Sequence, residues 1–351
     1  MTPQITVVMP VRNGARWLNE ALASVAAQTL PDWELIAIDD GSTDGTPGIL
    51  HEFADRDSRV RVIAQQPLGL VAALNRGLAE ARAPLLARLD ADDRALPQRL
   101  DRQLRHLNAH PDVGLLGSWA RKIDERGATR GILRPATEPD ALALGLLQGN
   151  PFVHSSVIFR TELVRRLKGF RPAFRAAEDY DLWLRLAETA RLANLPEVLV
   201  EYRWHSENVT SRNAIRQAFS ARLAQRSALA RRATGNDPGD GLDSPPDWRA
   251  PIADMAFYAS DAMLYRLLDL ADPNFLADAG DDVDFAPLED RFAELNHVER
   301  GLAAQAMINH MTRAGRSSAR HTRRLFLRLL RRRPGMVPRA AWSSLPAALL
   351  R

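Results

Sequence analysis

Residues 85–93 read Leu85-Leu86-Ala87-Arg88-Leu89-Asp90-Ala91-Asp92-Asp93, a short apolar run that ends in three carboxylates. Pro84 precedes the run, and an apolar stretch of this length is typical of a buried strand in a parallel sheet. Open α/β sheets bind ligands just beyond the carboxyl ends of their strands. The stretch therefore predicts a parallel sheet with a ligand site at one edge.

The spacing of the acids indicates what kind of ligand the site binds. Asp90 and Asp92 are two positions apart, so an extended backbone points both side chains the same way. Two carboxylates this close repel each other unless a cation lies between them, and hard oxygen ligands favour Mg²⁺ or Mn²⁺. We predict a divalent-cation site at Asp90 and Asp92. The alternative is a solvated turn whose acid caps the helix expected after Pro97.

The composition is that of a globular protein with a full core. The chain has 351 residues, of which 46% are hydrophobic and 26% are charged. It contains no cysteine, which excludes disulfide bonds and thiolate chemistry. The sequence has no secretory signal pattern and no apolar stretch long enough to span a bilayer. We therefore expect a cytoplasmic protein.

Strand and helix patterns alternate in the first part of the chain. Strands are predicted at residues 5–9, 34–38, 60–63 and 85–89, and helices follow the first three of them. This alternation predicts βαβ units and a mainly parallel sheet. Asp39-Asp40 and Asp90 then lie at the same edge, facing one crevice. The sequence has neither G-x-x-x-x-G-K-[ST] nor G-x-G-x-x-G, which argues against P-loop and dinucleotide-binding chemistry.

Strand patterns stop after about Arg212, and helices are predicted near residues 215–233, 252–271 and 289–311. We therefore expect a first domain at 1–212, followed by an α-helical C-terminal region at 213–351 with a basic amphipathic tail. In that tail, Arg316–Arg333, leucines and a phenylalanine alternate with arginines.

The basic tail has two interpretations. It is either a surface helix docked on the protein or an interfacial helix on anionic lipid, where each basic residue near the surface adds about 1 kcal/mol. The second would bring the protein to the inner face of a membrane. Few aromatic residues occur among the arginines, so we expect no nucleic-acid partner.

Six short motifs occur in order, each at the end of a predicted strand or helix. They are Thr6-Val7-Val8-Met9-Pro10-Val11-Arg12-Asn13-Gly14, Ile38-Asp39-Asp40-Gly41-Ser42-Thr43-Asp44, Ala72-Ala73-Leu74-Asn75-Arg76-Gly77, Ala87-Arg88-Leu89-Asp90-Ala91-Asp92-Asp93, Glu178-Asp179-Tyr180-Asp181-Leu182-Trp183 and Tyr202-Arg203-Trp204-His205. By these motifs residues 1–212 resemble the family 2 glycosyltransferases, which are inverting enzymes of the GT-A fold.

The resemblance implies a fold and a division of labour. The fold would be α/β, with a GT-A (Rossmann-like), mainly parallel sheet flanked by helices. Residues 1–95 would form the nucleotide-binding half and residues 96–212 the acceptor half. The enzyme would be a hexosyltransferase of bacterial polysaccharide or glycan biosynthesis.

The resemblance also implies a nucleotide-sugar donor, with a UDP-sugar expected. Its contacts would come from Pro10, Val11, Arg12, Asn13, Asp39, Asp40, Asn75, Arg88, Asp90 and Ala91. Asp39 or Asp40 would accept hydrogen bonds from the uracil ring or the ribose hydroxyls. Arg88 would pair with the donor, hold the acids apart, or only balance charge. The segment 65–70 departs from the family's pattern, so the resemblance supports no inference about contacts from it.

By the same resemblance, Asp90 and Asp92 are the metal motif, with Asp92 the preferred direct ligand, Asp93 a cap and His205 close to the diphosphate or the metal. Asp179 is the general base, and Glu178 assists it. The base takes the proton of an acceptor hydroxyl that attacks the anomeric carbon from the face opposite the diphosphate, so the anomeric centre inverts. A divalent cation neutralises the leaving diphosphate.

His154 and Trp204 are candidates for the acceptor side, although a structural histidine and a core tryptophan are the alternatives. The acceptor would be a glycan or a lipid-linked saccharide. Three other functions stay open, one of which is a metal-dependent hydrolase. A nucleotidyltransferase that makes sugar nucleotides would need a glycine-rich basic loop, of which Val11-Arg12-Asn13-Gly14 is a poor version. A non-catalytic sugar-nucleotide-binding protein would have no need for all of the acids.

Overall fold

The computed structural model describes residues 3–205, 214–250, 258–271, 283–313 and 316–332. Within these residues the strands form one nine-stranded sheet of order β3-β2-β1-β4-β8-β6-β9-β5, with β7 paired to β6. The strands are β1 (Ile5–Val11), β2 (Trp33–Asp40), β3 (Val60–Gln65), β4 (Leu85–Arg88), β5 (Arg94–Ala95), β6 (Val113–Ile123), β7 (Thr129–Leu133), β8 (Ile158–Arg160) and β9 (Arg191–Arg203).

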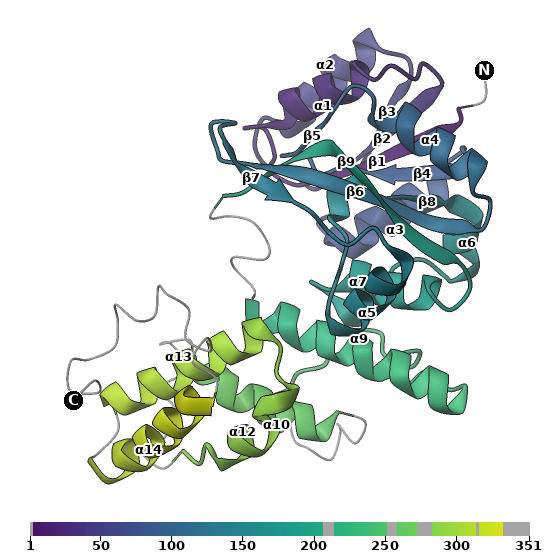
Figure 1. Ribbon diagram of the computed structural model, residues 1–351. Coiled ribbons are helices and arrows are strands. Elements are labelled where there is room, and N and C mark those ends of the chain that lie inside the picture. The colour runs from purple at the N-terminus through teal and green to yellow at the C-terminus, as the bar shows by residue number, and fades with distance from the viewer. Residues whose placement is uncertain (1–2, 206–213, 251–257, 272–282, 314–315, 333–351) are drawn as a thin grey trace.

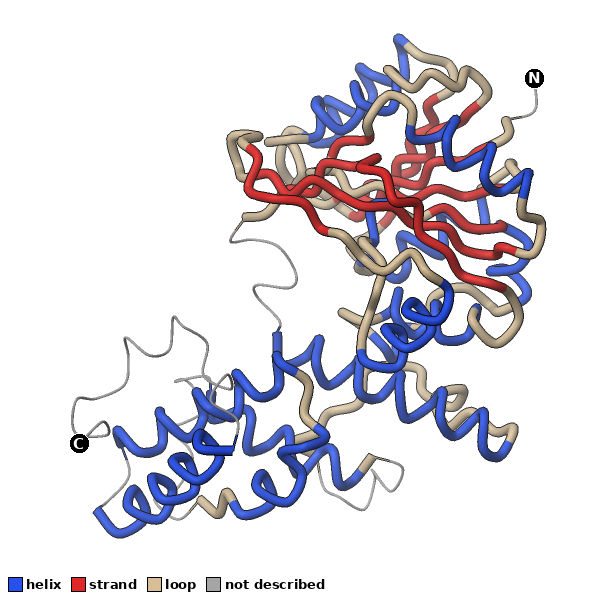
Figure 2. The backbone as a smooth tube through the Cα atoms, viewed as in Figure 1, coloured by secondary structure: helices blue, strands red, loops and turns tan. Residues whose placement is uncertain are grey.

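Helices cover both faces of the sheet, and after β9 the described elements are helical (Figures 1 and 2). The helices are α1 (Leu18–Ala26), α2 (Thr46–Arg56), α3 (Leu70–Glu80), α4 (Arg99–Ala109), α5 (Pro139–Gln148), α6 (Thr161–Arg166), α7 (Glu178–Leu186), α9 (Ala214–Thr234), α10 (Ala259–Leu268), α12 (Ala286–Arg291), α13 (His297–Arg313) and α14 (Arg316–Arg332). Short 3₁₀ turns are η1 (His154–Ser156), η2 (Pro172–Phe174), η4 (Asp269–Ala271) and η5 (Phe292–Glu294).

The sheet has a parallel half and a mixed half. Strands β3, β2, β1 and β4 are parallel neighbours, as the alternation of strand and helix patterns predicts. Strand β4 then pairs antiparallel with β8, and β8 antiparallel with β6, while β9 runs parallel to β6. The carboxyl end of β4 therefore lies where the two halves meet, which is where ligands bind in open α/β sheets.

Each face of the sheet has its own apolar core, because side chains alternate along a strand. Val7 and Met9 of β1 pack with α1, α2 and α4, whereas Val8 packs with α3, α6 and α7. The second core continues without interruption into the C-terminal helices, and α9 contacts α7 on one side and α10 and α13 on the other (Figure 1). The C-terminal helices thus share a core with the sheet.

The helical patterns are confirmed in part. The helix predicted near residues 215–233 is α9. The helix predicted at 289–311 is divided into α12, η5 and α13. Helix α13 has its own start because Asn296 Oδ1 accepts the N–H groups of Val298 and Glu299. The first six residues of the helix predicted at 252–271, and the predicted boundary at residue 212, lie outside the described residues.

Helix α14 is docked on the protein. Its residues Leu325, Phe326 and Leu329 are buried, and the helix packs on α13. Its basic face points outward, and Arg328 forms an ion pair with Glu289. The apolar face is therefore already used in packing, which argues against its insertion into a bilayer. Arg333 lies outside the described residues.

Among the described residues, no helix combines the length and the apolar character needed to cross a membrane.

Candidate functional site

The three carboxylates after β4 form an acid cluster. One carboxylate oxygen from each of Asp90, Asp92 and Asp93 lies within 4.8 Å of the others. Arg88, the last residue of β4, is buried and donates both terminal nitrogens to Asp90. The stretch is a turn, as one of the two interpretations has it, but it is only partly open to solvent: Asp90 and Asp92 are half-buried and Asp93 is 1% exposed.

The acid cluster fits a divalent cation. Asp93 Oδ2 is buried and has no hydrogen-bond partner among the described residues. Burial raises the pKa of Asp93 well above its usual range, and the charges of Asp92 and Asp90 raise it further. Hard oxygen donors, one of them buried without a partner, are what Mg²⁺ or Mn²⁺ needs, and a cation here would remove their mutual repulsion. Asp93 does not cap a helix as predicted, since its Oδ1 accepts the backbone N–H of Arg203 at 2.7 Å.

His205 lies beside the acid cluster. Its Nε2 is 2.8 Å from Asp92 Oδ2, and its ring packs on Trp17 with 4.5 Å between ring centroids. In this arrangement the histidine orients the Asp92 carboxylate. Its predicted role at the metal stays a prediction.

Arg203 is a site residue that the sequence did not single out. It is 1% exposed, and its guanidinium donates to the Asp92 carbonyl at 2.8 Å and to Glu20 at 2.7 Å. It also reaches the carbonyls of Asp124 and Glu125, at 3.2 Å each. Arg203 therefore clamps three segments around the acid cluster. Its place in the Tyr202–His205 motif was the only sequence signal.

The ends of β1 and β2 lie at the same edge of the sheet as the end of β4, with β1 next to β4, and the loops that follow them are joined to each other by hydrogen bonds. Asn13, whose φ is +53°, donates its backbone N–H to Ser42 Oγ at 2.9 Å and accepts the N–H of Thr43 at 2.8 Å. Asp39 is buried and accepts the N–H of Ser42 at 3.0 Å. Arg12 is exposed at this edge. Pro10 and Val11 belong to β1, so the first strand extends two residues beyond the predicted 5–9.

Two predicted donor contacts already have other partners. Both oxygens of Asp40 are engaged, accepting Gln65 Nε2 at 2.7 Å and the N–H groups of Leu68 and Gly69 at 2.8 Å each. The amide of Asn75 donates to the Phe170 carbonyl at 2.8 Å and accepts its N–H at 2.9 Å. Both side chains therefore fix loops, and of the two acids at the end of β2, Asp39 fits a donor contact better.

Glu178 and Asp179 begin α7 and form an acid pair. Burial and the charge of Asp179 raise the pKa of Glu178 to about 7, against the opposing effect of Arg88. Burial also raises the pKa of Asp179, against a hydrogen bond from the backbone of Tyr180 and the charge of Arg88. Asn150, which no sequence motif indicated as a site residue, donates to Asp179 Oδ2 at 2.7 Å.

The short turn η1 connects the acid cluster with the acid pair. Ser155 Oγ donates to Asp90 Oδ2 at 3.0 Å, and the neighbouring His154 places its Nδ1 3.7 Å from Asp179 Oδ2. Burial, together with the charge of Arg88, lowers the pKa of His154 well below its usual range, so its ring is neutral. One turn therefore contacts both groups of acids. Like Arg203, Ser155 is a site residue that the sequence did not single out.

Trp204 is not a core residue. It is 40% exposed, and Lys122 Nζ lies 3.9 Å from the centroid of its ring. With His205, Glu125 and Arg126 it lines an open pocket of about 540 Å³ beside the acid cluster. Ala91, a predicted donor contact, lies in the turn of the acid cluster, between Asp90 and Asp92.

Comparison with known proteins identifies the family. The model of glycosyl transferase family 2 matches residues 6–167. The amylovoran biosynthesis glycosyltransferase AmsE of Erwinia amylovora is 32% identical over 220 residues, which cover 62% of this chain and 82% of that protein. The UDP-Gal:alpha-D-GlcNAc-diphosphoundecaprenol beta-1,3-galactosyltransferase of Escherichia coli is 28% identical over 228 residues, covering 64% of this chain and 82% of that protein.

Two solved structures share the fold. S. aureus TarS 1-349 in complex with UDP-GlcNAc has a TM-score of 0.59 at 15% identity, covering 94% of this chain and 92% of that one. The mannosyltransferase PcManGT from Pyrobaculum calidifontis in complex with GDP-Man and Mn2+ has a TM-score of 0.53 at 20% identity, covering 100% of this chain and 86% of that one. These likenesses confirm the α/β GT-A fold. By its sequence relatives, the chain belongs to glycosyl transferase family 2 and is a glycosyltransferase.

Proposed function

We propose that this enzyme transfers a hexose from a UDP-sugar to a hydroxyl of a glycan or lipid-linked acceptor, with inversion of the anomeric centre. Residues 1–212 would form the transferase domain and residues 213–351 a helical region that supports it. The observation that carries the proposal is the position of η1, which contacts Asp90 with Ser155 and approaches Asp179 with His154. A donor diphosphate at the acid cluster would then have its sugar near the acid pair.

Asp179 is the proposed general base. Asn150 and the Tyr180 N–H donate one hydrogen bond to each of its two oxygens, which orients the carboxylate and favours its ionised form. Neutral His154 beside it adds no competing positive charge. The pKa of Glu178 is raised to about 7, and a proton held by Glu178 would keep the pair from carrying two charges. Direct attack by the acceptor oxygen then inverts the anomeric carbon.

Asp90, Asp92 and Asp93 are the residues proposed to hold a divalent cation. Such a cation would supply charge neutralisation for the departing diphosphate. Arg88 holds Asp90 in place, while His205 and Arg203 hold the side chain and the backbone of Asp92. Asp39, Asn13 and Arg12 are the proposed contacts to the nucleoside.

A UDP-sugar is favoured as the donor by two of the compared proteins. The Escherichia coli relative is named for UDP-Gal, and the TarS structure holds UDP-GlcNAc. The mannosyltransferase structure holds GDP-Man, so the test includes both nucleotides. Calorimetric titration with UDP-, GDP- and dTDP-sugars, each with Mn²⁺ and with chelator, decides the donor. Binding of a UDP-sugar that is lost with chelator is expected, and binding of another nucleotide class would contradict the proposal.

The lipid-linked acceptor is favoured by the same Escherichia coli relative, whose name specifies a diphosphoundecaprenol acceptor. Contact with an anionic membrane would come from the outward arginines of α14, among them Arg320 and Arg324. Sedimentation with anionic vesicles, with and without the residues from Arg316 onward, tests this contact. Equal sedimentation of both forms would exclude it.

The substitution Asp179→Asn tests the assignment of the base. We expect transfer to fall by about 100-fold or more while donor affinity stays the same, because the amide cannot accept the proton. Asp140→Asn, at an exposed acid on α5, is the control and is expected to change neither quantity. Loss of donor affinity with Asp179→Asn would reassign Asp179 to binding. The anomeric configuration of the product, measured by NMR, tests inversion separately.

A further inference from the structure

We propose that Arg171 and Asp237 are positioning residues, through which α9 and the turn after it hold Asp179 in its catalytic place. This inference rests on the proposed role of Asp179 as base. It gives the C-terminal helices a part in the reaction, although neither residue touches the acid pair.

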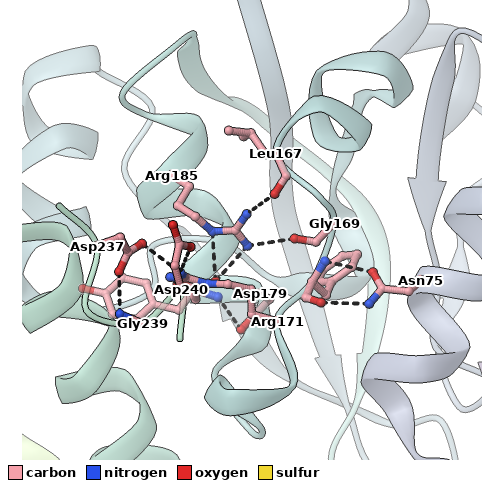
Figure 3. A network of polar contacts seen from close by, with 12 residues as sticks. Asn75, Leu167, Gly169, Arg171, Asp179, Arg185, Asp237, Gly239 and Asp240 are labelled. Carbon is pink, nitrogen blue, oxygen red and sulfur yellow. Dashed lines mark hydrogen bonds and ion pairs between the residues drawn. The ribbon is translucent and has the colours of Figure 1, made fainter. Parts of the chain in front are cut away.

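Arg171 connects α7 to the turn after α9 (Figure 3). Its Nε donates to Asp181 Oδ2 at 3.0 Å, and its Nη1 donates to Asp237 Oδ2 at 2.7 Å and to Asp240 Oδ1 at 3.0 Å. Asp181 is fully buried and lies two residues after Asp179, in the first turn of α7. A shift of Arg171 would therefore move the helix end that carries the acid pair.

Asp237 is itself held firmly. Its side chain is 5% exposed, and its Oδ1 accepts the Gly239 N–H at 2.8 Å. Arg231 of α9 donates to Asp237 Oδ2 at 2.6 Å and also pairs with Glu188 at 2.9 Å, just beyond the end of α7. Helix α7 is thus tied to the C-terminal helices near both of its ends.

Helix α9 also supports the segment that leads into the acid pair. Ser220 Oγ donates to the Arg175 carbonyl at 2.8 Å, and Gln225 Nε2 donates to Tyr180 Oη at 3.0 Å. Between these contacts Ala176 has a φ of +71°, a conformation that residues other than glycine adopt only when their surroundings impose it. The backbone before Glu178 is therefore held in a strained form by neighbours that include α9.

Positioning of this kind affects the rate of transfer. Misplacing a reacting group by about 1 Å can cost about 100-fold in rate, even when the change lies far from the chemistry. The donor contacts at β1, β2 and β4 do not pass through Arg171 or Asp237, so donor binding should be insensitive to them.

The test compares two buried aspartates of the C-terminal region. Asp237→Asn should lower kcat by about 10-fold or more with the KM for the donor within about twofold. Asp269→Asn is the matched control, because Asp269 is also buried and paired with an arginine, Arg249, but contacts neither α7 nor α9 through its hydrogen bonds. It should lose comparable stability and keep its kcat. Both are assayed well below their unfolding temperatures, with sites counted by donor titration.

Two further variants distinguish a positioning role of Asp237 from a general loss of stability, and failure of this inference from failure of the proposed function. Asp237→Glu keeps the charge and should restore most of kcat, which a general loss of stability would not predict. Equal kcat values for the Asp237→Asn and Asp269→Asn proteins would overturn the inference while leaving the proposed function intact. Full transfer activity in Asp179→Asn, measured in parallel, would instead overturn the proposed function.

Discussion

The acid cluster after β4 and the ion-pair network at α7 differ in how the charge of their carboxylates is compensated. In the acid cluster, three carboxylates lie within 4.8 Å of one another, and burial with their mutual repulsion raises the pKa of Asp93. In the ion-pair network at α7, Asp181 and Asp237 each meet two arginines. Burial there raises the pKa of Asp237, but Arg171 and the other partners lower it overall. Carboxylates without compensating positive charge indicate a site where a cation binds. Carboxylates paired with arginines instead stabilise the contact between two parts of the fold.

The largest expected effect is on the matched network. Asp181→Asn leaves Arg171 and Arg185 buried without their shared partner, so the free energy of unfolding should fall by about 3–5 kcal/mol. Denaturant titration measures the change. Asp101→Asn, which breaks an ion pair with the largely exposed Arg105, should change it by less than about 1 kcal/mol. Similar losses of unfolding free energy in both variants would mean that the buried ion pairs of Asp181 stabilise the fold no more than a surface ion pair does.

The opposite pattern is expected in the acid cluster. Asp92→Asn should lower transfer by about 100-fold or more, since it removes a proposed cation ligand. Its free energy of unfolding, measured without added metal, should stay the same or rise, because a repelling charge is gone. A loss of stability as large as that of Asp181→Asn would mean that the acid cluster also stabilises the fold.

The acid pair on α7 should show a smaller, pH-dependent effect. The pKa of Glu178 is raised from 4.5 to about 7, so between these values the unfolded chain has released a proton that the folded protein keeps. Stability should therefore fall as pH rises through this window, by a few kcal/mol at most. Thermal unfolding of wild type and Glu178→Gln from pH 4 to 8 measures this, and the variant should show a flatter profile. If the stability of both proteins changed with pH in the same way, the pH dependence would come from groups other than Glu178.

The sequence predicted those parts of the site that follow from local patterns. Apolar runs ending in acids identified β2, β4 and the position of Asp90, and the Glu178-Asp179 motif correctly fell at the start of a helix. What it could not predict depends on partners far away in the chain. Nothing local distinguishes Asp39 from Asp40, and only the fold shows that Asp40 is occupied by the loop 65–69.

The same limit applies to Arg203, Ser155 and Asp237. Each acts through side chains or backbone groups brought close only by the sheet order or by the packing of α9 on α7. The basic tail is a further case. Its pattern allowed a docked or a membrane-bound helix, and the choice depended on whether another helix, here α13, covers Leu325 and Phe326.

Arg203 also has a consequence for how the protein is made. Asp93 is synthesised 110 residues before Arg203, whose backbone N–H it accepts, and β9, which ends at Arg203, is the last strand in chain order within the described residues. Early strands can pair during synthesis, but the acid cluster stays without its clamp until β9 inserts beside β6. Activity should therefore be acquired late in biogenesis, and a chain that stops short of Arg203 would carry the three acids without the residue that arranges them.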